Sequence, residues 1–370
     1  MQFIDLKTQQ EKIREEIEQN IKKVLDHGKY IMGPEIEELE LTLRNYCGVK
    51  HAIGVASGTD ALLIPLMAYD IGPGDAIFTT TFTFIATAEV ILLLGATPVF
   101  VDIDQETFNI DTKKLDEAIE KTAKEGRLKP KGILPVDLFG QSADYDKINE
   151  IAKKYNLFVI EDAAQSFGAS YKGRKTCSLA DVASTSFFPA KPLGAYGDGG
   201  MIFTDDDELY KKIISIRVHG SGTDKYKNIR VGLNGRLDTM QAAVLLAKFK
   251  IFDEEIKLRQ IIAEKYNNAL KSSLKVPTVK SHNISAWAQY ALLHNERDKI
   301  IKQLKDDGIP VAIYYPIPLH LQEAFSQLGL KKGDFPISEK YSEEIFSIPF
   351  HPYLNTEDQD KIINSIKSVL

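Results

Sequence analysis

The chain has 370 residues, 44% of them hydrophobic and 26% charged, and a formal net charge of −6. This length predicts two domains, or one large α/β domain with a smaller partner. Binding to nucleic acid needs a basic face, so the negative charge and the absence of a basic stripe argue against that partner. The two cysteines cannot build a disulfide framework, and neither a secretion signal nor an apolar run of membrane-spanning length is present. We therefore expect a cytoplasmic protein without a membrane segment.

The predicted elements begin with an amphipathic helix, because Ile13, Ile17, Ile21 and Val24 recur at helical spacing before Gly28. From residue 52 onward, short apolar runs alternate with longer helical stretches. Several of these runs lack a polar alternation, which is typical of strands covered on both faces. The pattern predicts an α/β fold with a mainly parallel sheet flanked by helices. The predicted strands are Ala52–Ala56, Ala76–Thr80, Pro98–Val101, Gly132–Leu138, Leu157–Ile160, Val182–Phe188 and Met201–Thr204.

A long helical pattern follows from about Asp238 to Leu270, and its character changes near Phe252-Asp253. We interpret it as the connector to a smaller C-terminal domain, which contains the run Ile309–His320 and a closing helix near Glu357–Leu370. The prediction is a large domain over residues 1–240, including the N-terminal helix. The connecting helix and the small domain then occupy residues 241–370.

A single lysine, Lys191, stands between the turn residue Pro189 and four closely spaced glycines that end at Gly200. A lysine held in this way has little freedom to move. A fixed amine beside a phosphate-sized ligand suits a Schiff-base cofactor, because the lysine must form an imine, leave it and return as the proton carrier. A loop lysine is ordinarily a solvated surface residue. The groups found at other predicted strand ends favour the catalytic interpretation here.

Ser57-Gly58-Thr59-Asp60 follows a predicted strand and precedes a helical stretch. Ser57 and Asp60 have the spacing of a capping pair, and a helix cap alone would explain them. A helix N-terminus with a glycine at its mouth also offers free N–H groups and a favourable dipole to a phosphate. We assign the cofactor phosphate to this position, mainly to Gly58 and Thr59.

Another strand ends in Glu161-Asp162 and continues into Ala163-Ala164-Gln165. A carboxylate at the C-terminal end of a strand points into the crevice where α/β sheets bind ligands. Asp162 would there pair with a protonated pyridine nitrogen, and Gln165 would reach the phenolic oxygen of the same ring. The competing interpretation of Asp162 is a helix cap.

Phe82 and Phe84 lie beside small hydroxyl residues at a further strand end, and either ring would suit the face of the cofactor. Core packing is the ordinary role of each ring. Arg236 lies just before the connecting helix and is suited to bidentate binding of a carboxylate or phosphate. The seven histidines form no close pair, so no metal site is predicted, and no strand-linked G-x-G-x-x-G supports a nicotinamide cofactor.

Four motifs together resemble the DegT/DnrJ/EryC1/StrS sugar aminotransferases, which have the aspartate-aminotransferase fold (fold type I) of pyridoxal-phosphate (PLP) enzymes. The resemblance extends from Phe3 to Tyr353, and its motifs are Ser57–Leu62, Glu161–Ser166, Ser186–Gly200 and Asn234–Asp238. It implies a large domain with a mainly parallel sheet and a smaller C-terminal α/β domain. It also implies that the protein is an enzyme, a PLP-dependent aminotransferase.

The resemblance assigns roles to particular residues. It implies that Lys191 forms the imine with PLP, that Asp162 holds the ring nitrogen, that Gln165 lies by the ring oxygen, and that Phe84 stacks on the ring. The implied phosphate contacts are Ser186, Gly58 and Thr59. Members of the family are homodimers, and the residue matching Asn234 reaches the phosphate from the neighbouring subunit. The implied substrate contacts are Arg236, Tyr314, Tyr315 and His320.

The resemblance further implies that L-glutamate donates the amino group to a nucleotide-linked keto-sugar. The preferred acceptor is a UDP-linked 3-keto hexose or uronic acid, such as UDP-2-acetamido-3-keto-glucuronate, made for cell-surface polysaccharide such as O-antigen. Tyr314 stands where close relatives carry histidine, which weakens the uronic acid form. The alternatives are a 4-keto nucleotide-sugar aminotransferase and a non-catalytic regulator of the same fold. The family's 3-dehydratases replace the lysine with histidine, so Lys191 argues against that branch.

Overall fold

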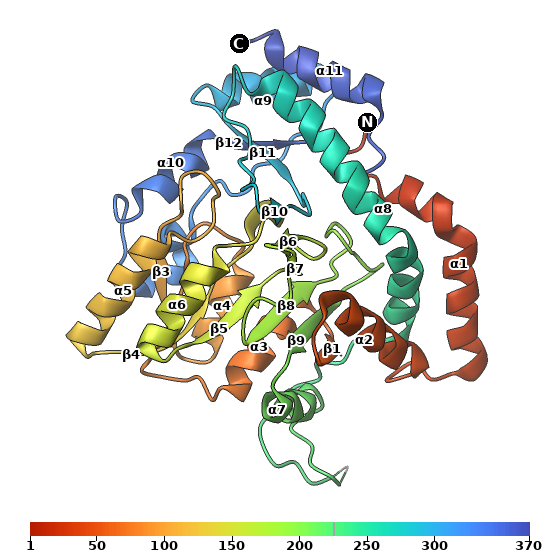
Figure 1. The fold of residues 1–370 in the computed structure, drawn as a ribbon, viewed down its shortest axis with the longest axis vertical. Coiled ribbons are helices and arrows are strands. Elements are labelled where there is room, and N and C mark those ends of the chain that lie inside the picture. Colours follow the sequence, from red (N-terminus) through yellow and green to blue (C-terminus); the bar gives the residue numbers. More distant parts are fainter. Residues whose placement is uncertain (225) are drawn as a thin grey trace.

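The computed structural model describes residues 1–224 and 226–370, and among these residues the largest sheet has seven strands in the order β1-β9-β8-β5-β4-β2-β3 (Figure 1). The strands from β8 to β3 run parallel, whereas β9 pairs antiparallel with both β1 and β8. The predicted mainly parallel sheet is thus confirmed. Its strands are β1 His51–Val55, β2 Asp75–Thr80, β3 Thr97–Val101, β4 Lys129–Leu134, β5 Phe158–Asp162, β8 Val182–Ser186 and β9 Gly200–Thr204.

Helices cover both faces of this sheet, which is why its strands are apolar without alternation. In β9, Met201 and Phe203 pack into the core beneath α2 and α8, while Ile202 points into the core beneath α3 and α7. α5 and α6 cover the sheet around β4. The bounds of the helices are α1 Leu6–His27, α2 Pro34–Cys47, α3 Gly58–Ala68, α4 Ala86–Leu93, α5 Thr112–Glu125, α6 Tyr145–Tyr155, α7 Asp207–Arg217 and α8 Thr239–Leu270.

The helix α8 runs from the large sheet to a separate two-stranded sheet of β11 and β12, and α1 lies along its first half (Figure 1). Ile13 and Ile17 of α1 pack there on Val244 and Ala247 of α8. The C-terminal elements are β11 Tyr290–Leu293, α9 Arg297–Asp306, α10 Pro336–Glu344, β12 Ile345–Ile348 and α11 Thr356–Lys367. The remaining short strands are β6 Ser170–Tyr171, β7 Arg174–Lys175 and β10 Asn283–Ile284. The boundary at residues 240 and 241 stays a prediction.

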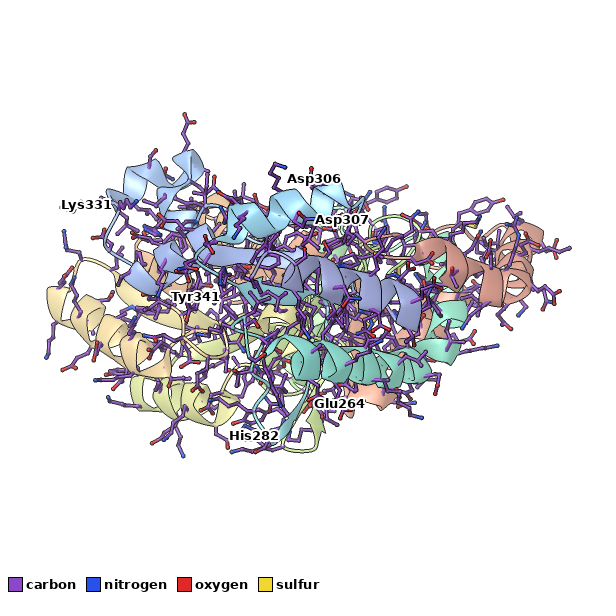
Figure 2. The ribbon with its side chains drawn as sticks, turned by 90° about the horizontal axis from the view of Figure 1, so that it is seen from above. Glu264, His282, Asp306, Asp307, Lys331 and Tyr341 are labelled. Carbon is purple, nitrogen blue, oxygen red and sulfur yellow. The ribbon has the colours of Figure 1, made fainter. Side chains whose placement is uncertain are left out.

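Seen from above, α9 and α11 lie side by side over the small sheet, with Asp306 and Asp307 labelled at the end of α9 (Figure 2). Ser365 of α11 donates its hydroxyl to Asp307 Oδ2 over 2.6 Å. The apolar faces of these helices and of the second half of α8 enclose one core, in which Tyr290 and Phe346 are fully buried. The other face of the small sheet packs on the large domain, because Ala291, Leu293 and Ile345 share a cluster with Phe82 and Val136, which follow β2 and β4.

Two local expectations are wrong. The strand predicted to continue to Leu138 ends at Leu134, because Leu138–Gly140 form a 3-10 turn in which Phe139 has φ of 58°. α8 is continuous through Phe252, whose ring is buried against the large-domain core. Asp253 and Glu254 are exposed on this helix, whereas Glu255 is buried and accepts a hydrogen bond from Gln9 Nε2, and none of them interrupts the helix. In residues 1–224 and 226–370, no helix combines the length and apolar character that crossing a membrane requires.

Candidate active site

A cavity of about 560 Å³ opens where β5 and β8 end, and Gln289, which directly precedes β11, also lines it. The carboxyl ends of parallel strands are the usual ligand-binding edge of an α/β sheet. Seven residues with predicted roles at the cofactor line it together: Gly58, Thr59, Phe84, Asp162, Gln165, Ser186 and Lys191. Tyr314 and Tyr315, predicted to contact the substrate, line the same cavity. Residues as far apart in the sequence as Gly58 and Tyr315 therefore line one cavity.

Lys191 lies on the irregular segment that follows β8, and its N–H donates to Phe188 O over 2.9 Å. Gly194 is required here, because a Cβ at that position would stand 2.4 Å from Pro189 O. The segment returns to the sheet where Ala195 N–H donates to Phe187 O over 2.7 Å. Burial lowers the pKa of the Lys191 amine, and the charge of Asp162 opposes that shift. A lowered pKa increases the fraction of neutral amine, which is the form that acts as nucleophile and base.

Asp162 is the last residue of β5 and is almost completely buried. Thr87 Oγ1 donates to its Oδ2 over 2.9 Å, and Ala164 N–H donates to its Oδ1 over 3.2 Å. Burial raises the pKa of Asp162, whereas these two hydrogen bonds and the charge of Lys191 lower it. A buried carboxylate that retains two donors is suited to hold a cationic ring nitrogen.

The side-chain amide of Gln165 is fixed from both ends. Its Oε1 accepts the N–H of Phe139 over 2.8 Å, and its Nε2 donates to the hydroxyl of Tyr315 over 3.1 Å. The main-chain donor fixes which end of the amide is oxygen, so Nε2 is the end available to an oxygen of a bound ring. The left-handed turn at Phe139 that ends the predicted strand early therefore positions Gln165.

The N-terminus of α3 lies against the end of β8. Asp60 N–H donates to Ser57 Oγ over 3.0 Å, so Ser57 caps the helix and the predicted capping pair is confirmed. The N–H groups of Gly58 and Thr59 have no acceptor within the helix, as is general for a first turn. A Cβ at Gly58 would come 2.6 Å from the Ser186 Cβ, so only glycine lets the helix approach Ser186 this closely.

The two phenylalanines considered for the cofactor face have different environments. Phe82 is fully buried and packs on Phe108 and Tyr315, which gives it a core role. Phe84 lines the cavity and is 55% exposed. An exposed ring at the mouth of a cavity has a free face on which a planar ligand can stack. Of the two rings, only Phe84 is placed for that contact.

Three predicted residues lie outside the lining of this cavity. Asn234 is exposed, and the Nε atom of Arg236 is buried without a hydrogen-bond partner among the described residues. His320 is buried, and its ring nitrogens pair with Thr81 Oγ1 at 2.8 Å and with Glu339 Oε1 at 2.9 Å. Both nitrogens of His320 are thus occupied within the protein, and its predicted contact with substrate stays a prediction.

Sequence reasoning missed several residues of the site. Thr87 stands one helical turn beyond Phe84 and holds Asp162, but nothing in its sequence context indicates that partner. Ile4, Asp198 and Gln289 also line the cavity. Gln289 precedes β11 in the small sheet, and no local motif connects it with residues of the large sheet. Only the folded chain brings it to the site.

The residues present fit PLP. A helix N-terminus with two free N–H groups and the Ser186 hydroxyl suit a phosphate, while Asp162 suits the ring nitrogen. A Cβ at Gly58 would fill the space beside Ser186, so the lack of a side chain at Gly58 lets the helix N-terminus and the Ser186 hydroxyl lie close together. Within residues 1–224 and 226–370, no group of three or more His, Cys, Asp or Glu side chains is arranged to hold a metal ion.

Comparison with known proteins places this chain among sugar aminotransferases. The sequence profile of the DegT/DnrJ/EryC1/StrS aminotransferase family matches residues 11–367. The UDP-2-acetamido-2-deoxy-3-oxo-D-glucuronate aminotransferase of Pseudomonas aeruginosa is 50% identical, over 96% of each chain. A pleiotropic regulatory protein of Geobacillus stearothermophilus is 42% identical, over 98% of this chain and 97% of that protein. The UDP-N-acetyl-3-dehydro-alpha-D-glucosamine 3-aminotransferase of Acidithiobacillus ferrooxidans is 39% identical, over 100% of this chain and 97% of that protein.

Solved structures agree with this assignment. A DegT/DnrJ/EryC1/StrS aminotransferase from Brucella abortus superposes with a TM-score of 0.98 at 50% identity, over 100% of this chain and 99% of that chain. NtdA from Bacillus subtilis, solved with bound cofactor PMP, superposes with a TM-score of 0.88 at 31% identity. The superposition covers 99% of this chain and 83% of that chain. PMP is the aminated form of PLP. The predicted fold type is confirmed.

Proposed function

The chain belongs to the DegT/DnrJ/EryC1/StrS aminotransferase family, whose members depend on PLP, and we propose that it transfers the amino group of L-glutamate to a UDP-linked 3-keto sugar. One observation carries the reaction type: Lys191 and Asp162 line one cavity, and each charge shifts the pKa of the other group. A lysine paired across a small cavity with a buried carboxylate is the arrangement that PLP chemistry needs.

The relatives support amination at C3. The names of the relatives from Pseudomonas aeruginosa and Acidithiobacillus ferrooxidans both specify a UDP-linked sugar with an acetamido group and a 3-keto carbon. We therefore prefer UDP-2-acetamido-3-keto-glucuronate or the corresponding hexose as acceptor, for cell-surface polysaccharide synthesis. No relative described above favours the 4-keto alternative.

When bound, PLP supplies an electron sink that stabilises negative charge on the carbon bonded to the transferred nitrogen. The residues proposed to hold it are Gly58, Thr59 and Ser186 at the phosphate, Asp162 at the ring nitrogen, Gln165 at the ring oxygen and Phe84 on the ring face. Asp162 keeps the ring nitrogen protonated because its carboxylate is buried and has no competing cation other than Lys191 among the described lining residues.

Lys191 is the proposed proton carrier. Its Nζ removes the proton from the α-carbon of glutamate and, in the second half of the reaction, delivers a proton to the sugar carbon that receives nitrogen. The lowered pKa supports the first of these tasks, because a neutral amine is required to accept a proton. Release of 2-oxoglutarate before the sugar binds predicts ping-pong kinetics.

The charge of the substrate supports a site completed by a second copy of the chain. A nucleotide diphosphate, with or without a sugar carboxylate, requires cations, and Lys191 is the only lysine or arginine among the described residues that line the cavity. Arg236 has a buried Nε without a partner, and Asn234 is exposed on the same segment. We propose a homodimer in which both residues reach the cavity of the neighbouring subunit.

The test is amino transfer by purified protein from L-glutamate to UDP-linked 3-keto and 4-keto sugars, with 2-oxoglutarate and amino sugar both measured. Transfer to the 3-keto sugar supports the proposal. Preference for the 4-keto sugar would move the assignment to that alternative.

Lys191→Ala provides the control for the reaction type. Borohydride is expected to fix PLP to Lys191 in the wild type and to leave the folded variant unlabelled, as peptide mass spectrometry would show. Protein that takes up no PLP would instead favour a regulatory role, such as the name of the Geobacillus relative describes.

A further inference from the structure

A second buried acid, Asp137, lies next to the cavity and takes no part in the proposed reaction. Asp137 is fully buried and is not among the described residues that line the cavity, although the preceding residue, Val136, does line it. Burial raises the pKa of Asp137, its hydrogen bonds oppose that shift, and the charge of Asp162 adds to it. Burying a carboxyl group is costly unless every oxygen has a donor, so the donors of Asp137 indicate what it is for.

The two oxygens of Asp137 hold two different parts of the chain. Oδ1 accepts the N–H of Ala143 over 2.8 Å, which closes the turn that begins at Leu138. Oδ1 also accepts the hydroxyl of Tyr145 over 3.1 Å, at the start of α6. Oδ2 accepts the hydroxyl of Ser166 over 2.8 Å. Ser166 is fully buried as well, so this hydrogen bond is shielded from water and is correspondingly strong.

Both of these parts carry groups that are proposed to meet the PLP ring. The turn contains Phe139, whose N–H donates to Gln165 Oε1 over 2.8 Å, and Ser166 directly follows Gln165 in the chain. At the main chain, Asp137 N–H donates to Asp162 O over 3.0 Å. Asp137 therefore binds the segment 162–166 at its beginning and at its end, and it closes the turn that holds Gln165 from the other side.

We infer that Asp137 is a positioning residue for the PLP ring, which keeps Asp162 and Gln165 at the separation that the ring nitrogen and ring oxygen require. The inference rests on the PLP-binding part of the proposed function. None of the hydrogen bonds of Asp137 goes to the residues proposed for the cofactor phosphate. Loss of Asp137 should consequently weaken the contacts of the ring and leave those of the phosphate unchanged.

Binding of PMP to protein from which the cofactor has been removed tests the inference by calorimetry. PMP forms no covalent bond with Lys191, so its affinity reports the ring and phosphate contacts alone. Ser166→Ala removes the donor to Oδ2 and keeps the packing, and we expect it to weaken PMP binding by about tenfold. Asp137→Ala should weaken PMP binding by at least the same factor. Asp137→Asn should stay within about threefold of the wild type, because the new amide accepts at its oxygen and donates from its nitrogen to the Ser166 hydroxyl.

Tyr145→Phe is the matched control, because it removes the other side-chain hydroxyl bound to Asp137, on the side of α6. It should change the affinity for PMP by less than about twofold. Inorganic phosphate, measured by its competition with PMP, should bind to every variant as it does to the wild type. The double variant Asp137→Ala with Ser166→Ala should lose no more affinity than Asp137→Ala alone, since both residues act through one hydrogen bond.

The outcomes separate this inference from the proposed function. Unchanged PMP affinity in Ser166→Ala, or an equal loss of affinity for inorganic phosphate, would leave Asp137 with a structural role only and overturn the inference. A loss in Asp137→Asn as large as that in Asp137→Ala would assign the effect to charge and overturn the positioning role. Wild-type protein that binds no PMP would overturn the PLP site itself. Urea titrations of the cofactor-free variants verify that each is folded, and Ser166→Ala decides the test if Asp137→Ala is not.

Discussion

Replacing Thr87 by valine tests whether the buried carboxylate depends on its hydrogen-bond donors. Thr87→Val keeps the shape of the side chain but removes the 2.9 Å hydrogen bond to Asp162 Oδ2, leaving Ala164 N–H as the remaining donor from the protein. A hydrogen bond to a charged group contributes about 1.5–3 kcal/mol, so the ionised form of Asp162 should lose a factor of roughly ten to a hundred relative to the neutral form.

The sign of the pH effect follows from that loss. Asp162 must be ionised to hold a protonated ring nitrogen, and removal of a donor raises its pKa further above the ordinary value. The rate of the glutamate half-reaction falls at low pH as Asp162 becomes protonated. In Thr87→Val this acidic limb of the pH–rate profile should therefore move to higher pH. The assay is stopped-flow absorbance of the bound cofactor in single turnovers with glutamate across the pH range.

Thr83→Val is the matched control. Thr83 is also buried, and its hydroxyl contacts Thr87 Oγ1 at 3.3 Å but makes no hydrogen bond to the Asp162 carboxylate. The acidic limb of the pH–rate profile of Thr83→Val should stay close to that of the wild type. Superimposable profiles of wild type and Thr87→Val, or an equal displacement in Thr83→Val, would refute the reasoning.

Three further predictions concern the phosphate, the dimer and the acid stability. Gly58→Ala places a Cβ 2.6 Å from the Ser186 Cβ and should weaken PLP binding by about tenfold or more, measured by fluorescence titration; unchanged affinity would contradict the phosphate assignment. Co-expressed Lys191→Ala and Asn234→Ala chains should regain amino transfer, because one mixed site has both residues intact only if Asn234 acts across the dimer. Inactive mixed dimers, verified by mass spectrometry, would place Asn234 in its own subunit. Burial lowers the pKa of His351 to about 4 from 6.5, so stability present above pH 6.5 should decline as the pH falls toward 4 by up to about 3 kcal/mol. His351→Gln should flatten that decline in urea titrations, and an unchanged slope would show that other groups cause it.

Local sequence patterns were sufficient for the large sheet. The strand β9 was recognisable because both of its faces are buried, and α3 because Ser57 caps it. The predicted end of one strand was wrong for a non-local reason. The run to Leu138 is apolar enough for a strand, but Phe139 adopts a left-handed conformation so that its N–H meets Gln165 Oε1. A tertiary hydrogen bond there outweighs the local preference.

The candidate site likewise contains residues whose proximity the sequence predicts, while the position of other residues could not be predicted from it. Lys191, Asp162 and Gly58 follow strands of one sheet, and strands of one sheet place their ends along a common edge, so their proximity follows from sequence order and fold class. His320 lies in a segment near the site, yet its ring pairs with Thr81 and Glu339 and stays outside the cavity lining. Sequence position alone did not distinguish a residue beside the site from one in it.

The sequence by itself determined the α/β fold, the constrained lysine and the residues proposed to hold the cofactor, because each depends on a short motif at the end of a strand. The tertiary structure alone decided which other residues share the cavity with Lys191. Ile4 lies near the N-terminus, Gln289 directly precedes β11, and Tyr314 lies between α9 and α10, so no local periodicity relates them to Lys191. Their meeting depends on how the core around α8 seats the small sheet over the large one, which is a property of long-range packing.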